Sequence, residues 1–103
     1  MFDKKKRYIT RGVNAEVDIR LQILIWGLID KLKENKSFQL DYLQVFNICK
    51  KDYKILLEHT QEVSEYKKLY EIKNIGDIEL QEKLKLFVID DADYSTMLLA
   101  QEY

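Results

Sequence analysis

The feature that most constrains the fold is a long apolar helical pattern that follows Asp18. Asp18 is a favourable helix N-cap, and the pattern predicts a helix that continues to about Asn35. Its principal apolar face follows the helical period and consists of Leu21, Leu24, Ile25, Leu28, Ile29 and Leu32. A second, adjoining apolar face contains Ile19, Ile23 and Trp26. Because this surface is wider than one sheet face usually covers, either other elements wrap over the helix or its second face contacts a partner.

Segments with strand-like composition lie before and after this helix. Alternation and β-branched or aromatic residues predict strands at residues 7–13, 42–49, 54–63, 66–72 and 84–89. A closing helix is expected from residue 94 to about residue 102, with Asp93 as its cap. We therefore expect an α+β fold: a mostly antiparallel sheet of four to five strands with a long N-terminal helix and a short C-terminal helix.

Composition limits the class of protein. With 103 residues, of which 47% are hydrophobic, residues 1–103 are expected to form a single domain with its own core. Lys and Arg number 17 and Asp and Glu 18, so the net charge of −1 provides no overall attraction to nucleic acid or to an anionic membrane. The single cysteine, Cys49, excludes an internal disulfide, and neither a secretory signal nor a membrane-spanning apolar run is recognisable. These features predict a cytoplasmic protein that does not associate with membranes.

An acidic cluster, Asp90, Asp91 and Asp93, is the strongest candidate for chemistry. Its carboxylates would suit Mg²⁺ or Ca²⁺, or acid/base work with Arg11 as an anion contact. The spacing matches no complete metal-binding loop, and Asp is common in solvated turns, so a strand-to-helix turn is the favoured interpretation. His59 is interpreted as a lone surface or edge histidine. We assign no catalytic residue, metal or cofactor, and an enzyme is less expected than a binding protein.

Two groups of side chains predict binding surfaces. Residues 4–7 form a basic run next to Tyr8, and two lysines lie between Tyr66 and Tyr70. Basic residues next to aromatic rings are what binding of single-stranded nucleic acid needs, provided that both segments lie on one surface. The second group suits a protein partner, including a second copy in a homodimer, because large apolar and aromatic side chains anchor interfaces. It combines the spare helix face with an exposed strand and consists of Ile23, Trp26, Tyr66 and Tyr70.

Several stretches resemble a bacterial family of Gram-positive organisms, domain of unknown function nine-sixty. They are Arg7-Tyr8-Ile9-Thr10-Arg11-Gly12, Asp41-Tyr42-Leu43-Gln44-Val45-Phe46, Glu65-Tyr66-Lys67, Phe87-Val88-Ile89-Asp90-Asp91 and the closing Asp93-Tyr94-Ser95-Thr96-Met97-Leu98-Leu99-Ala100-Gln101-Glu102-Tyr103. The resemblance implies a small cytoplasmic protein, also met in phages and mobile elements, and it implies no activity, cofactor or catalytic residue.

The same resemblance directs attention to two polar stretches that packing alone does not require. They supply the polar-site candidates Thr10, Arg11, Asp90, Asp91, Asp93 and Tyr94. The molecular function stays unassigned at this level. A non-catalytic interaction or accessory module is favoured, followed by a nucleic-acid-binding accessory protein and then by a metal-dependent acid/base enzyme built on the acidic cluster.

Overall fold

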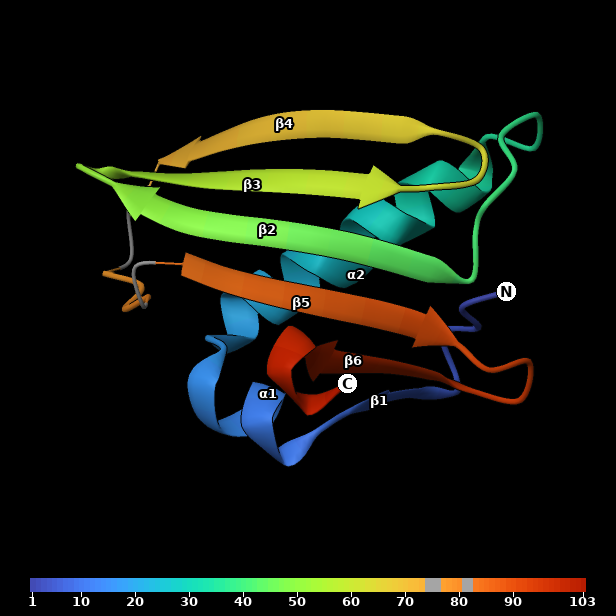
Figure 1. Ribbon diagram of the computed structural model, residues 1–103, viewed down its shortest axis with the longest axis horizontal. Helices are drawn as coiled ribbons and strands as arrows, with labels where there is room; N and C mark the ends of the chain where they lie inside the picture. Colours follow the sequence, from blue (N-terminus) through green and yellow to red (C-terminus); the bar gives the residue numbers. More distant parts are fainter. Residues whose placement is uncertain (74–76, 81–82) are drawn as a thin grey trace.

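A computed structural model describes residues 1–73, 77–80 and 83–103 of the chain (Figure 1). Its elements follow one another as β1 (Arg7–Ile9), α1 (Arg11–Glu16), α2 (Ile19–Glu34), β2 (Leu43–Lys51), β3 (Lys54–Gln61), β4 (Tyr66–Lys73), β5 (Lys83–Asp90), β6 (Ser95–Leu99) and a 3-10 helix, η1 (Ala100–Glu102). In Figure 1, α2 crosses diagonally behind the sheet. The fold therefore has two layers, a sheet and one long helix on one of its faces.

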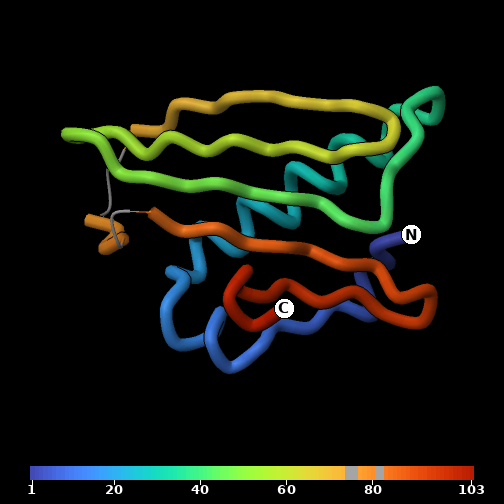
Figure 2. Tube along the Cα trace, viewed as in Figure 1, coloured from blue at the N-terminus to red at the C-terminus, as the bar shows by residue number. Residues whose placement is uncertain are grey.

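The described residues form one sheet of six strands in the order β1-β6-β5-β2-β3-β4. Strands β2, β3 and β4 form an antiparallel meander, and β5 pairs antiparallel with the other side of β2. Strand β6 folds back on β5, and β1 then pairs parallel with β6. Figure 2 shows the consequence: the blue N-terminal strand lies beside the red C-terminal one. The two edges of the sheet are β1 and β4.

The predicted fold class is wrong in its sheet and in its helices. The sheet is mixed and has six strands in the described part of the chain, because β1 pairs parallel with β6. The predicted strand over residues 7–13 ends at Ile9, because the Thr10 side chain accepts a hydrogen bond from the Val13 N–H and starts α1. The helical part therefore consists of two helices, the short α1 and the long α2, instead of one long N-terminal helix.

The predicted C-terminal helix is also wrong. Residues 95–99 form β6, and only Ala100–Glu102 are helical, in a single 3-10 turn. Ser95, Met97 and Leu99 are buried while the residues between them are half-buried, which is the two-residue period of a strand. Asp93 therefore lies in a turn between two strands and caps no helix.

The core lies between α2 and the sheet face that it covers. Asp18 caps α2 through a hydrogen bond from the Arg20 N–H to its side chain, as the sequence predicts. From α2, the buried side chains are Leu21, Gln22, Ile25 and Ile29. The sheet contributes alternate residues of its strands: Phe46, Ile48, Ile55, Leu57, Leu86, Val88, Met97 and Leu99. No helix among the described residues is long and apolar enough to cross a membrane.

Candidate functional site

The sheet face opposite α2, which we call the open face, carries two groups of apolar side chains that are separated by the cross-strand row Lys85–Asn47–Glu58. Strand register places one set of side chains on this face, and the core set points toward α2. Leu69 is 61% exposed, and the other apolar members are half-buried. Its apolar residues are Leu43, Val45, Phe87, Ile89 and Leu98 in one group and Cys49, Leu56 and Leu69 in the other. In Figure 1 it is the face toward the viewer, and neither α1 nor α2 crosses its central strands.

Residues 45–46 of β2 and 86–89 of β5 are apolar on both sides of the sheet, although α2 covers only one side. On β2, Phe46 points into the core and Val45 lies on the open face, and on β5 the same is true of Val88 and Phe87. Antiparallel sheets with one face in water usually alternate apolar and polar residues, whereas strands covered on both faces are apolar throughout. This part of the two strands therefore has the composition of strands that are covered on both faces.

The part of the open face near β4 is hollow and basic. A pocket of about 520 Å³ lies over Cys49, Leu56 and Leu69, with Lys83 and Lys85 at its border. Among the described strand residues, this face carries six lysines and two glutamates: Lys51, Lys54, Lys67, Lys73, Lys83, Lys85, Glu58 and Glu71. Both glutamates already pair with lysines, at 3.6 Å for Lys54–Glu71 and 3.5 Å for Lys67–Glu58. The remaining charge at this border is positive.

A C-terminal ring covers one point of the open face. Tyr103 packs edge-on against Phe87, with 5.5 Å between ring centroids. Lys85 lies over the same Phe87 ring, 5.7 Å from its centroid. The one phenylalanine of the open face is therefore already contacted within the chain.

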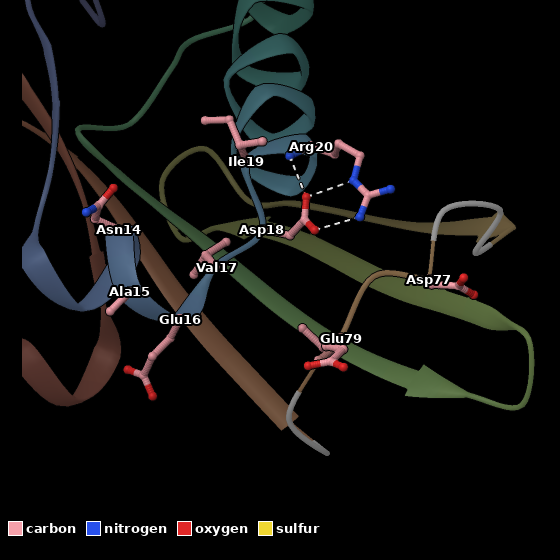
Figure 3. A pocket seen from close by; sticks show the side chains of 10 residues that line it. Asn14, Ala15, Glu16, Val17, Asp18, Ile19, Arg20, Asp77 and Glu79 are labelled. Carbon is pink, nitrogen blue, oxygen red and sulfur yellow. Dashed lines mark hydrogen bonds and ion pairs between the residues drawn. The ribbon is translucent and has the colours of Figure 1, made fainter.

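A larger cavity, of about 1000 Å³, lies between the α1–α2 junction and residues 77–80. Figure 3 shows the Glu16, Asp77 and Glu79 carboxylates pointing away from one another, so no acid pair is formed. Asp18 accepts two hydrogen bonds from the Arg20 guanidinium, at 2.9 and 2.7 Å. These bonds, with the Arg20 backbone N–H, lower the pKa of Asp18 to about 2. Of the charged residues here, Asp18 caps α2 and Arg20 pairs with it.

The acidic cluster forms the turn between β5 and β6. Asp90 Oδ1 accepts the Phe2 N–H at 3.1 Å, and the Asp91 N–H donates to the Tyr94 carbonyl at 2.8 Å. Ala92 occupies the left-handed region, with φ of 64°, which reverses the chain. No group of three or more His, Cys, Asp or Glu in the described residues is arranged to hold a metal ion. Tyr94 packs edge-on against Tyr8, 5.5 Å away.

Thr10 and Gly12 take part in a group of hydrogen bonds that joins α1 to η1. Thr10 Oγ1 donates to Glu102 Oε1 at 2.7 Å, and the Leu99 and Gly12 N–H groups donate to the same carboxylate. The hydrogen bond from Thr10, together with those from the two N–H groups, lowers the pKa of Glu102. Arg11 is exposed, and Figure 1 places α1 and the β5–β6 turn at opposite ends of the sheet. The structure does not bring Arg11 together with the acidic cluster.

The four residues predicted as a partner surface have different environments. Ile23 is 65% exposed on α2. Trp26 is half-buried, and the Arg7 guanidinium of β1 lies 4.7 Å from its ring centroid. Tyr66 packs edge-on against Phe38, and Tyr70 is half-buried on the same edge strand. Trp26 therefore contacts the β1 edge of the sheet, whereas both tyrosines lie at the β4 edge.

The basic and aromatic segments proposed for nucleic acid are also separated. Residues 4–8 lead into β1 and residues 66–70 lie in β4, at opposite edges of the sheet. Neighbouring strands are about 4.8 Å apart, so the two edges of this sheet are about 24 Å apart. The two segments do not form one binding surface.

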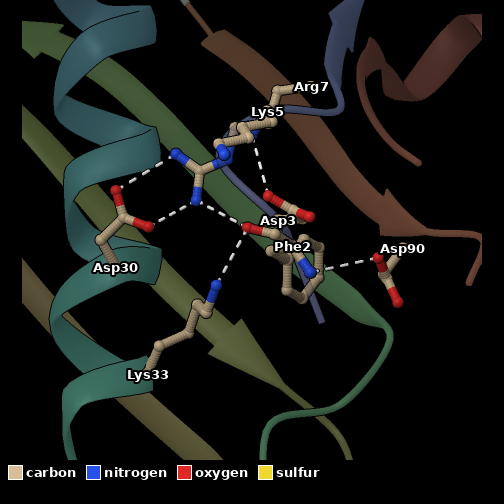
Figure 4. A network of polar contacts seen from close by, with 7 residues as sticks. All are labelled: Phe2, Asp3, Lys5, Arg7, Asp30, Lys33 and Asp90. Carbon is tan, nitrogen blue, oxygen red and sulfur yellow. Dashed lines mark hydrogen bonds and ion pairs between the residues drawn. The ribbon is translucent and has the colours of Figure 1, made fainter. Parts of the chain in front are cut away.

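Arg7 joins the N-terminal segment to α2 (Figure 4). Its guanidinium pairs with the Asp30 carboxylate in a two-point contact and also donates to the Phe2 carbonyl at 2.8 Å. Lys33 Nζ donates to the same carbonyl at 3.2 Å. Burial raises the pKa of Asp30, but the hydrogen bonds and charge of Arg7 outweigh it, so the pKa lies below its usual value.

Sequence reasoning missed a buried polar group made of Gln44, His59 and Gln61. His59 is fully buried, which contradicts the surface position expected for it. It hydrogen bonds to Gln44 at 2.7 Å, and Gln44 donates to Gln61 at 2.7 Å. Gln61 Nε2 donates to the carbonyls of Gln39 and Ser64, which ties two loops to the sheet. The signal was the two-residue spacing of Leu57, His59 and Gln61, because a strand places all three on the core face.

Comparison with known proteins agrees with this fold. A crystal structure of a protein of unknown function from Enterococcus faecalis superposes with a TM-score of 0.80, at 25% sequence identity, over 99% of this chain and 94% of that chain. A search of curated proteins found no match. Residues 6–102 match the sequence model of the family described as Staphylococcal protein of unknown function (DUF960). The chain therefore belongs to this family, whose molecular function is unknown.

Proposed function

We propose that the chain is a non-catalytic interaction module whose open face binds a protein partner. The observation that carries the proposal is the group of apolar side chains on the side of the sheet that α2 does not cover, with Val45, Phe87 and Leu98 at its centre. Apolar surface of this kind gains stability when it leaves water, and on soluble proteins it marks interaction sites.

The charges at the border specify the partner. Lys83 and Lys85 flank the pocket, and the two glutamates of this face are already paired with lysines. An apolar protein surface bordered by carboxylates would complement this arrangement in both shape and charge. A second copy placed face to face would instead bring lysines close to lysines, which opposes such an arrangement.

Nucleic acid is the weaker candidate for this face. Single-stranded nucleic acid binds where aromatic rings allow its bases to stack. The open face offers few rings: Phe87 is already packed against Tyr103, and Tyr8, at the β1 edge, is packed against Tyr94. The cytosol is the proposed compartment, since Cys49 is a free thiol and cytosolic proteins keep their thiols reduced.

The experiment begins with photo-crosslinking in cells, from a reactive residue placed at Leu98 on the open face or at Ile23 on α2. The captured protein is then purified, and its affinity is measured for the wild type and for the variants Leu56→Glu and Ile23→Glu. We expect Leu56→Glu to weaken binding by about tenfold or more, because it adds a carboxylate to the interface, and Ile23→Glu to leave binding unchanged.

Circular dichroism and unfolding curves establish that both variants are folded. The proposal fails if the captured molecule is a nucleic acid. It also fails if Ile23→Glu abolishes binding of the purified partner while Leu56→Glu does not.

A further inference from the structure

The free edge of the sheet at β4 is the second surface with the properties of an interface. β4 (Tyr66–Lys73) pairs with β3 on one side, and no other described segment pairs with its opposite side. Figure 1 shows the strand running along the upper border of the sheet without a covering element. An edge of this length presents a row of unpaired backbone N–H and C=O groups that another strand can bind. The other edge, β1, has only three residues.

The charges along β4 are arranged so that an identical strand, running in the opposite direction, would place an opposite charge against each of them. Leu69 lies at the centre, with Lys67 two residues before it and Glu71 two residues after it. Glu65, directly before the strand, and Lys73, at its end, repeat the same relation four residues from the centre. A strand with this pattern, paired antiparallel with an identical strand about Leu69, meets an opposite charge at each of these positions.

From this pattern and the free edge we propose that β4 binds β4 of a second copy of the chain, antiparallel, with Leu69 opposite Leu69. Lys67 then faces Glu71 of the second copy, and Glu65 faces Lys73. On the side of the sheet that bears α2, Tyr66 faces Ile72 and Lys68 faces Tyr70 of the second copy. The contact is isologous, since the same residues are used by both copies.

Neighbouring registers lack this complementarity. A slip of two residues, which keeps each side chain on its own face, places Lys67 opposite Lys73 or Glu65 opposite Glu71. A slip of one residue turns the second sheet over, so that its α2 side lies level with the open face of the first. The exposed Lys67 is then opposite the half-buried Ile72. Pairing about Leu69 is thus the register that the charges select.

The ion pairs already present within the chain extend into the same arrangement. Glu71 lies 3.6 Å from Lys54 of β3, and Lys67 lies 3.5 Å from Glu58 of β3. Pairing of the two β4 strands joins these ion pairs into a row of alternating charge: Lys54 and Glu71 of one copy, followed by Lys67 and Glu58 of the other. The two-fold symmetry generates this row twice, and a network of charges contributes more than isolated surface pairs.

The dimer would also change what the open face can bind. Residues directly opposite each other in a sheet share a face, so pairing of Leu69 with Leu69 places both open faces on the same side. The two sheets then form one continuous sheet with two copies of the basic pocket. This inference depends on the edge of β4, and the proposed function depends on Leu56 and the face, so either can fail alone.

The test uses charge reversal and sedimentation equilibrium of the purified chain. We expect the wild type to dimerise and the variants Lys67→Glu and Glu71→Lys to weaken dimerisation, each by about tenfold or more, because each places two like-charge pairs in the symmetric interface. Mixing the two variants in equal amounts should restore a dimer, since every pair in the mixed species is again opposite in charge. The double variant Lys67→Glu/Glu71→Lys should dimerise by itself.

Lys85→Glu is the matched control, because Lys85 lies on the same face but on the interior strand β5. It should dimerise like the wild type. A wild type that remains monomeric at about 1 mM overturns the proposal, since that limit corresponds to negligible affinity. A dimer that neither single variant weakens, or single variants whose mixture stays monomeric, also overturns it.

Discussion

Lowering the pH should destabilise the protein through His59, the only histidine in the sequence. Gln44 donates through its amide nitrogen to the Asp41 carbonyl, at 2.9 Å, so its amide oxygen must be the atom that faces His59. His59 Nε2 therefore carries the proton and donates it to Gln44. The other ring nitrogen, Nδ1, is buried and has no hydrogen-bond partner among the described residues.

Protonation of Nδ1 would place a charge and an unpaired donor in the core. Burial accordingly lowers the pKa of His59 from 6.5 to about 4. The Phe46 ring, stacked on the imidazole at 4.2 Å, and the Tyr66 ring at its edge leave little space for water. Lys68 is the cross-strand neighbour of His59 and, as a cation, opposes a second positive charge.

The sign and size of the effect follow from linkage between protonation and folding. Between pH 6.5 and about 4 the unfolded chain binds a proton at His59 and the folded chain does not, so stability falls as the pH falls. The loss approaches about 1.4 kcal/mol for each pH unit in this window. From about pH 7.5 to about pH 5 it amounts to about 2 kcal/mol. Carboxylates with lowered pKa, such as Asp30, lose their contribution mainly below this range.

The assay is urea unfolding at both pH values, for the wild type and for His59→Gln. The glutamine offers an N–H to Gln44 but does not titrate. Most of the loss of stability between the two pH values, about 2 kcal/mol in the wild type, should therefore disappear in the variant. A proton NMR titration of the single imidazole gives the pKa directly. An imidazole pKa near its ordinary value, or an equal pH dependence in both proteins, would refute the reasoning.

Three further substitutions have expected outcomes. Gly12→Ala should destabilise the protein by about 1 to 2 kcal/mol in urea unfolding, because its Cβ would lie 2.7 Å from Cδ1 of the buried Leu99. Gly27→Ala should stabilise it by about 0.5 to 1 kcal/mol in the same assay, since nothing lies within 4 Å of that Cβ and alanine favours the helix. Asp30→Asn should cost about 3 kcal/mol, seen as a lower midpoint of thermal unfolding, because it removes the negative charge that faces the Arg7 guanidinium, whose side chain is only 12% exposed.

Local sequence signals predicted the four strands from β2 to β5. The expected segments 42–49, 54–63, 66–72 and 84–89 match β2, β3, β4 and β5 to within two residues at each end. These strands are long and bounded by turns, so their composition was informative. β6 was missed because its short run Ser-Thr-Met-Leu-Leu fits either a helix or a strand, and pairing with β1 and β5 decides between them.

The helix α1 was missed because part of its cap comes from a distant residue. A capping box places an acidic side chain three residues after the cap, and here that position holds Val13. Glu102 supplies the carboxylate instead, 92 residues from Thr10 in the sequence. From local sequence, Thr10 is a strand residue whose polarity has no explanation, and only the fold shows that it contacts Glu102 near the other end of the chain.

The sequence shows which strand residues are apolar or charged, but the order of the strands in the sheet decides which of them lie on an uncovered face or a free edge. The apolar run Leu86-Phe87-Val88-Ile89 indicates a strand covered on two faces, and it cannot show that the fold supplies only one cover. Likewise, the symmetric arrangement of opposite charges about Leu69 could not select a partner if the strand were an interior one, because neighbouring strands would then occupy both of its sides. At the β4 edge the same charges face solvent, and there they select a partner strand and its register.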